Sequence, residues 1–282
     1  MNPNDTETLQ TDLENGASNS AVAYPNIKSV VILFFMSILF MIVIGVAAGI
    51  IAIGIHNSAQ IYKSLLNFVA YIISILLIIN YASKRVSAFS VNFNKIQGWL
   101  VPVIIIGALG LIMPLSQIEN WLPMPESIKK FFELAFKKDF FSIATLVIAA
   151  PLLEEILCRG IVLKGLLKNY TPRKAIIISA IFFAAIHLNP WQAFPAFFGG
   201  LFMGWLYNKT QSVIPGIIAH ATINAAGALL MFAPAKQQDL LTPMGTPFYI
   251  LALIVSVIVF VGICLIIQKK AIILPISVRF KY

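Results

Sequence analysis

Residues 140–163 read FFSIATLVIAAPLLEEILCRGIVL, and this stretch decides the fold. It is long and apolar enough to cross a bilayer as a helix, because about 20 apolar residues span roughly 30 Å of hydrocarbon. Yet Glu154, Glu155 and Arg159 lie inside it. A charged group at the centre of a membrane helix costs about 2.5–3.5 kcal/mol, so such groups are rare and usually serve a site. The stretch therefore predicts a transmembrane helix that carries a polar site.

The rest of the chain has the same membrane character. Hydrophobic residues make up 59% of the 282 residues and charged residues 11%, whereas an average soluble chain has about 25% charged residues. We expect an all-α membrane protein with about eight transmembrane helices and an intramembrane polar site. The predicted spans are Ile27–Ile55, Leu65–Ala82, Trp99–Leu115, Phe140–Leu163, Ala175–Leu188, Gln192–Tyr207, Val213–Phe232 and Phe248–Ile267. Pro190 separates the fifth span from the sixth, because proline breaks the helical hydrogen-bond ladder.

Composition divides the chain into four parts. Residues 1–25 are polar and predict a disordered tail. Residues 26–139 hold the first three spans and an amphipathic segment, Leu122–Lys138, which we expect to lie on the membrane interface. Residues 140–232 hold the polar residues of the spans, and residues 233–282 hold the last span and a basic tail. The first apolar run is too long for the core of a signal peptide, so we expect it to be retained.

Lysine and arginine predict the orientation in the membrane. With the N-terminus inside, the inner connections and the C-terminus hold twelve of these residues, and Lys28 adds one more, against six in the outer connections. The positive-inside rule then favours both termini in the cytoplasm. This orientation also explains the net charge of +9 without a nucleic-acid partner. The expected partners are the lipid bilayer and a peptide or protein substrate.

Strongly polar residues inside the spans are few: Glu154, Glu155, Arg159, His187, His220 and Asn224. At a rise of about 1.5 Å per residue, a depth of roughly 10–18 Å from the cytoplasmic end is predicted for four of them: Glu154, His187, His220 and Asn224. Polar residues with independent structural roles would have no reason to agree in depth. The agreement predicts that three helices bring them into one site.

The spacing of these residues suggests different roles for the two glutamates. Glu155 and Arg159 are four residues apart, so they share a helix face and can pair. Glu154 is rotated by about 100° from Glu155 and is free to point elsewhere. A carboxylate with two histidines and an amide suits hydrolysis, in which the carboxylate takes a proton from water and a histidine or asparagine stabilises the oxyanion.

The same residues also suit a metal. A glutamate and two histidines form a known catalytic zinc ligand set, so Glu154, His187 and His220 are candidate ligands of Zn²⁺. The helical zinc motif HExxH is missing, and a metal-free mechanism stays open. Cys158 and Cys264 lie in different apolar runs without a CxxC partner, which favours a packing role for both.

Three motifs resemble those of a known family. Residues 154–159, EEILCR, resemble its EExxxR motif; residues 183–187, FAAIH, resemble its FxxxH motif; and residues 220–224, HATIN, resemble its HxxxN motif. The family is CPBP, which comprises CAAX proteases and bacteriocin-processing enzymes and is also called Abi. The resemblance covers residues from about 140 to 230 and identifies residues 140–232 as the catalytic core.

The resemblance implies an intramembrane protease of eight helices whose site opens to the cytoplasm. By the same resemblance, Glu154 activates water, His187 and His220 are catalytic or bind a metal, and Asn224 helps to form the oxyanion hole. The ion pair next to Glu154 supports the site. The family is described both as metalloproteases and as metal-free glutamate proteases, so the question of zinc stays open.

The function expected from these observations is that of an intramembrane endopeptidase acting on a membrane-associated peptide or protein. Bacteriocin maturation or self-immunity, in a bacterial plasma membrane, is the biological role that the resemblance implies. Two alternatives use the same polar residues: a non-catalytic immunity or scaffold protein, and an ion or proton-relay transporter. Transporters usually show internal repeats or paired broken helices, and the sequence shows neither convincingly.

Overall fold

The computed structural model describes residues 23–55, 59–122, 124–128, 130, 137–232 and 245–270. This part of the chain is helical and contains no strand, so the prediction of an all-α membrane protein is confirmed. Residues 1–22, residues 123, 129 and 131–136 of the predicted amphipathic segment, and residues 271–282 lie outside the described residues.

Eight helical passes form the described bundle. Seven are single helices: α2 (Ile27–Gly54), α3 (Gln60–Ser83), α4 (Leu100–Trp121), α9 (Pro172–Ala185), α10 (Pro190–Thr210), α11 (Ile214–Phe232) and α14 (Thr246–Lys270). The eighth is a continuous helix with changes of winding: α6 (Phe140–Ala144), η1 (Thr145–Ala149), α7 (Ala150–Glu155), η2 (Ile156–Leu163) and α8 (Lys164–Asn169). We call it the broken helix.

Six of the eight passes are long and apolar enough to cross a membrane. The other two, α9 and α10, are the predicted fifth and sixth spans; α9 has only 14 residues and α10 contains Pro195. The outer faces of α2 and α14 expose large apolar side chains such as Phe35, Ile50 and Ile258, as expected for surfaces that face lipid. The chain is thus an integral, multi-pass membrane protein.

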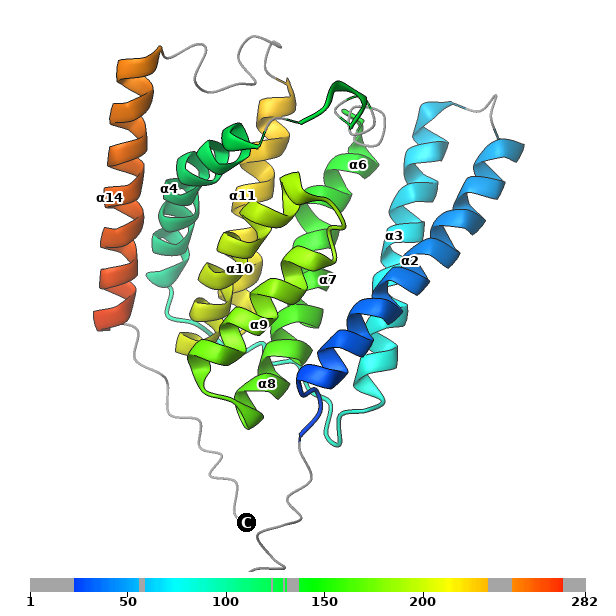
Figure 1. The fold of residues 1–282 in the computed structure, drawn as a ribbon, viewed down its shortest axis with the longest axis horizontal. Helices are drawn as coiled ribbons and strands as arrows, with labels where there is room; N and C mark the ends of the chain where they lie inside the picture. Colours follow the sequence, from blue (N-terminus) through cyan, green and yellow to red (C-terminus); the bar gives the residue numbers. More distant parts are fainter. Residues whose placement is uncertain are drawn as a thin grey trace, which may run out of the picture.

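Figure 1 shows the order of the helices across the bundle. The α2–α3 hairpin forms one flank and α14 the other, while α4, α9, α10, α11 and the broken helix lie between them. Helix α2 begins, and helix α14 ends, at the same end of the bundle. The described chain passes through the bundle eight times, and an even number of passes brings the chain back to the end where it started.

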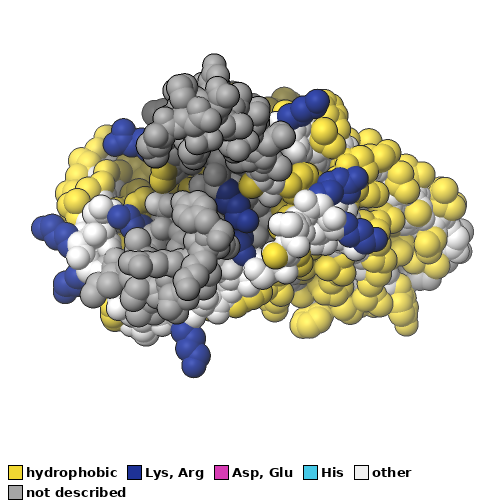
Figure 2. Space-filling model, turned by 90° about the horizontal axis from the view of Figure 1, so that it is seen from below, with side chains coloured by type: hydrophobic (Ala, Val, Ile, Leu, Met, Phe, Trp, Pro, Cys, Tyr) yellow, Lys and Arg dark blue, Asp and Glu magenta, His cyan; other side chains and the backbone are white. Residues whose placement is uncertain are grey.

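That end of the bundle is basic. Lys28 lies at the start of α2, Lys84 and Arg85 follow α3, and Lys269 and Lys270 end α14. Seen from this end, the described surface shows Lys and Arg side chains and no Asp or Glu (Figure 2). By the positive-inside rule, this charge distribution favours a cytoplasmic location for this end.

Residues 23–25, predicted as part of a disordered tail, are ordered. The backbone N–H of Ala23 donates to Asn169 Oδ1 at 3.0 Å, and Asn169 Nδ2 donates to the Ala23 carbonyl at 2.7 Å. Gly165 makes this contact possible, because a Cβ there would collide with Pro25. The prediction was wrong for these three residues because their anchor lies more than 140 residues away in the sequence.

The broken helix departs from the regular α-helix that the sequence predicts. The N–H of Ala150 bonds to the carbonyl of Thr145 and the N–H of Lys164 to that of Arg159, which is the wider π-type winding. Pro151 explains the first change, since its ring would clash with the carbonyl four residues earlier in an α-helix. Short π segments in helices often mark functional sites, and here one lies on each side of Glu154 and Glu155.

Small residues bring α10 close to α9. A Cβ at Gly200 would lie 3.2 Å from the backbone of Ala180, and one at Gly204 would lie 3.1 Å from Ile176. Such contacts let two backbones approach closely in lipid. Gly199 differs, because it lines the central cavity instead.

Candidate active site

A cavity of about 400 Å³ collects the predicted site residues. Its walls come from α2, α3, α4, α9, α10, α11 and the broken helix, and most of its lining is apolar. Four of the predicted residues line it: Glu154, His187, His220 and Asn224. The other two, Glu155 and Arg159, lie fully buried behind its wall. The structure thus places the predicted layer of polar residues around one space.

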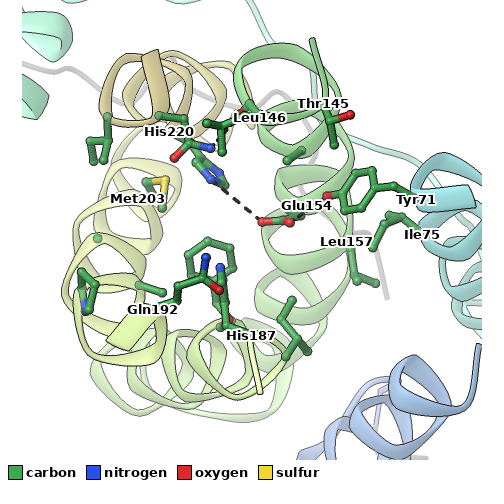
Figure 3. Close-up of a pocket in the computed structure, with 18 of the residues that line it drawn as sticks. Tyr71, Ile75, Thr145, Leu146, Glu154, Leu157, His187, Gln192, Met203 and His220 are labelled. Carbon is green, nitrogen blue, oxygen red and sulfur yellow. Dashed lines mark hydrogen bonds and ion pairs between the residues drawn. The ribbon is translucent and has the colours of Figure 1, made fainter. Parts of the chain in front are cut away.

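Glu154 points into this cavity and uses its two carboxylate oxygens differently (Figure 3). Oε1 accepts a hydrogen bond of 2.7 Å from the hydroxyl of Tyr71. Oε2 lies 3.9 Å from His220 Nε2. That distance is too long for a direct hydrogen bond, but a water between the two atoms could bond to both.

Glu155 and Arg159 form the predicted pair. Arg159 Nη1 donates to Glu155 Oε1 at 2.6 Å, and both side chains are 0% exposed. Arg159 Nη2 also donates to the carbonyl of Gly200 at 3.0 Å. Glu155 Oε2 and Arg159 Nε are buried with no hydrogen-bond partner in the described residues, so the pair offsets only part of the free-energy cost of removing both charges from water.

His220 lies between the two glutamates. Its Nδ1 is 3.3 Å from Glu155 Oε1, while its Nε2 faces Glu154. A carboxylate only accepts hydrogen bonds, so Nδ1 carries the hydrogen and a neutral ring has its lone pair on Nε2. Glu155 therefore orients His220 in the way that the acid of a catalytic triad orients its histidine.

Phe183 connects the polar residues through its ring. The guanidinium of Arg159 lies 4.8 Å from the ring centroid, and the rings of His187 and His220 meet it edge-on at 5.1 and 5.4 Å. The first residue of the FAAIH stretch, Phe183, thus packs against both histidines.

His187 lies in a sharp turn just after the end of α9. Its Nδ1 lies 2.8 Å from the carbonyl of Phe183, which can only accept, so Nε2 is the ring nitrogen left for other partners. The next residue, Leu188, has a φ of 58°, a left-handed conformation that is uncommon outside glycine. The side chain of Asn189 holds the turn, since its Nδ2 donates to the His187 carbonyl and its Oδ1 accepts from the N–H of Gln192.

Asn224 ties α11 to the broken helix. Its Nδ2 donates to the carbonyl of Leu146 at 2.8 Å. That carbonyl needs a partner, because the N–H of Ala150 bonds to Thr145 and Pro151 has no N–H to offer. The amide keeps a second N–H, and Asn224 lines the cavity. It therefore combines helix–helix bonding with a donor for the site.

Tyr71 was not among the site residues predicted from the sequence. It lies in the middle of α3, whereas tyrosines of membrane helices are usually found near the interfaces. A buried tyrosine hydroxyl normally finds a hydrogen-bond partner. The position of Tyr71 in the middle of a predicted span was the one sign in the sequence of a functional role. The sequence did not show that its partner is Glu154 on another helix.

Glu154, His187 and His220 are the candidate zinc ligands, and all three line the cavity. A catalytic zinc takes three protein ligands and keeps one open position. Within the described ranges of the chain, no three His, Cys, Asp or Glu side chains form a group that could hold a metal ion. Of the three candidate ligands, Glu154 and His220 are the pair that lies within 4 Å of each other in the described residues. The arrangement of these described residues does not fit a three-ligand zinc centre.

The fold and the site together define an integral membrane protein with a carboxylate and histidine site inside its helix bundle. Residues 136–226 match the family model described as type II CAAX prenyl endopeptidase, Rce1-like. The predicted resemblance to the CPBP family of CAAX proteases is thereby confirmed for this segment, which contains all six predicted site residues. No curated protein and no solved structure gives a significant match to the chain. The family match supports protease activity in general.

Proposed function

We propose that the protein is an intramembrane endopeptidase in which Glu154 is the general base. The observation that carries the proposal is the position of Glu154 Oε2 and His220 Nε2, which lie 3.9 Å apart on facing helices and border the same cavity. A water held by both atoms would have its oxygen directed at a substrate carbonyl.

The reaction follows from these positions. The water oxygen forms a bond to the carbonyl carbon as one of its protons moves to Glu154 Oε2, and His220 Nε2 accepts the hydrogen bond of the other O–H. The carbonyl electrons move to its oxygen, which becomes an oxyanion. Collapse of this intermediate re-forms the carbonyl and breaks the C–N bond, and Glu154 returns its proton to the leaving nitrogen.

In this proposal, two further residues assist the reaction. The second amide N–H of Asn224 can donate to the oxyanion, and a donor aimed at developing charge is among the largest contributions to catalysis. His187 lines the same cavity and, when its ring is protonated, offers a second donor through Nε2. Glu155 and Arg159 do not touch the cavity and act by holding His220 in place.

The lining of the cavity indicates the chemistry of the substrate. It includes Met41 of α2, Ile75 of α3, Leu115 of α4 and Met203 of α10, and no lysine or arginine of the described part of the chain lines it. We infer that the segment cleaved is apolar and uncharged and belongs to a membrane-associated peptide or protein. Bacteriocin maturation, self-immunity and removal of the end of a prenylated protein would all supply such a segment.

The test is cleavage of reporter peptides by the purified full chain in liposomes. Two reporters share one apolar sequence, and only one carries a farnesylated cysteine before its last three residues. Glu154→Gln should lower kcat/KM by about a hundredfold or more, the usual scale for a positioned acid or base. Its thermal unfolding should match that of the wild type, and metal content is assayed alongside. Full activity in Glu154→Gln would overturn the proposal.

A further inference from the structure

The hydroxyl of Tyr71 donates a hydrogen bond of 2.7 Å to Glu154 Oε1. Tyr71 lies on α3, outside the segment 136–226 that matches the endopeptidase family. The contact therefore joins the proposed general base to a helix that the family match does not include. Figure 3 shows the phenol ring approaching Glu154 from the side opposite His220.

This hydrogen bond restricts rotation of the Glu154 carboxylate. The terminal torsion of a glutamate side chain is broad, so an unanchored carboxylate rotates easily. No other hydrogen bond to Oε1 of Glu154 occurs among the described residues. With Oε1 held by Tyr71, Oε2 is the oxygen left to face His220 and the attacking water.

Two neighbouring contacts fix the position of Tyr71 itself. The hydroxyl of Ser64 donates to Asp139 Oδ2 at 2.5 Å, and the rings of Phe68 and Phe141 lie 5.8 Å apart. Ser64, Phe68 and Tyr71 follow one another at intervals of four and three residues, so they share one face of α3. This face packs along the broken helix and sets the register in which the hydroxyl reaches Glu154.

We propose that Tyr71 is a positioning residue of the protease site, through which the α2–α3 hairpin completes the active site. The inference rests on the proposed function, because it assigns Tyr71 a role only if Glu154 acts as the base. It goes beyond the family match, because the matched segment begins at residue 136 and α3 ends at Ser83.

Tyr71→Phe removes the hydroxyl and keeps the ring. Against the same reporter, its kcat should fall about tenfold or more, the scale for losing a hydrogen bond to a charged group. KM should change less than about twofold, because the interaction orients a catalytic group and does not bind substrate. Tyr81→Phe is the matched control, as Tyr81 lies on the same helix and does not line the cavity, and it should keep wild-type kcat.

Incorporation of 3-fluorotyrosine at position 71 keeps the donor and should restore most of the activity that Tyr71→Phe loses. A residue needed only for packing would tolerate phenylalanine, so wild-type kcat in Tyr71→Phe would overturn the inference. If Tyr71→Phe has wild-type kcat while Glu154→Gln is inactive, the inference about Tyr71 fails and the proposed function still stands. Full activity in Glu154→Gln would instead overturn the proposed function, and the role of Tyr71 with it.

Discussion

His220 lies between two glutamates that are adjacent in the sequence: its Nδ1 is 3.3 Å from Glu155 Oε1, and its Nε2 is 3.9 Å from Glu154 Oε2. Glu155 is fully buried with Arg159, whereas Glu154 borders the cavity. One carboxylate therefore orients the histidine and the other shares with it the space where a water would react. The two adjacent glutamates have different surroundings because neighbouring residues on a helix point in different directions.

Arg159→Ala should lower folded yield and thermal stability as well as activity. The substitution leaves Glu155 buried without its partner, and breaking a buried ion pair in this way costs about 3–5 kcal/mol. Apparent Tm in detergent and the monodisperse yield measure the effect. Arg85→Ala, at an exposed arginine that follows α3, is the control and should change Tm little. Wild-type stability of Arg159→Ala would show that the pair contributes nothing.

Gly216→Ala should lower activity by displacing Glu155. A Cβ at this position would collide with Glu155 Oε2, and Glu155 in turn orients His220. Overpacking of this kind typically costs about 1–3 kcal/mol, so we expect a lower Tm together with a severalfold or greater loss of kcat. Gly227→Ala on the same helix has no atom within 4 Å of the added Cβ and serves as the control. Equal behaviour of the two variants would argue against close packing at Gly216.

Asp139→Ala should destabilise the start of the broken helix in a pH-dependent way. Burial tends to raise the pKa of Asp139, but hydrogen bonds from Ser64 and Ser142 outweigh it and lower the pKa below its ordinary value. A carboxyl with a lowered folded-state pKa adds stability above its unfolded-state pKa and loses it as the pH falls through the folded-state pKa.

The loss in Asp139→Ala at pH 7 should be on the scale of a lost helix cap, about 1 kcal/mol. Wild type and variant should converge in Tm as the pH falls below about 4, where the ordinary aspartate protonates. Melting curves across pH 3 to 7 follow this difference. A gap that stays constant over the whole range would rule out the charged cap as its cause.

Both termini should be cytoplasmic. The beginning of α2 and the end of α14 lie at the same basic end of the bundle, and basic connections stay in the cytoplasm. Reporter fusions at the N-terminus and after Lys281 should both give cytoplasmic signals, while a fusion in the connection between α2 and α3 should not. A periplasmic or extracellular signal at one terminus only would contradict the eight passes.

Much of the fold follows from the sequence, because the bilayer admits few alternatives. A long apolar run must satisfy its backbone hydrogen bonds within itself, so it becomes a helix. The spans containing Glu154, His187 and His220 were predicted for that reason, and so was the turn at Pro190, which has no N–H to continue a helix. The spacing of Glu155 and Arg159 predicted their pairing because it depends on one helix only.

The side-chain contacts between different helices depend on the tertiary structure. No periodicity within α3 shows that Tyr71 meets Glu154, since the two residues are 83 positions apart and their contact depends on how two helices pack. The π winding around Pro151 arises from a clash inside the helix, yet its free carbonyl at Leu146 is satisfied by Asn224 from α11. The sequence by itself determined which residues could bear charge inside the membrane. Packing between helices decided which atoms those charges face, because each side chain reaches only a few ångströms and its partners come from distant parts of the chain.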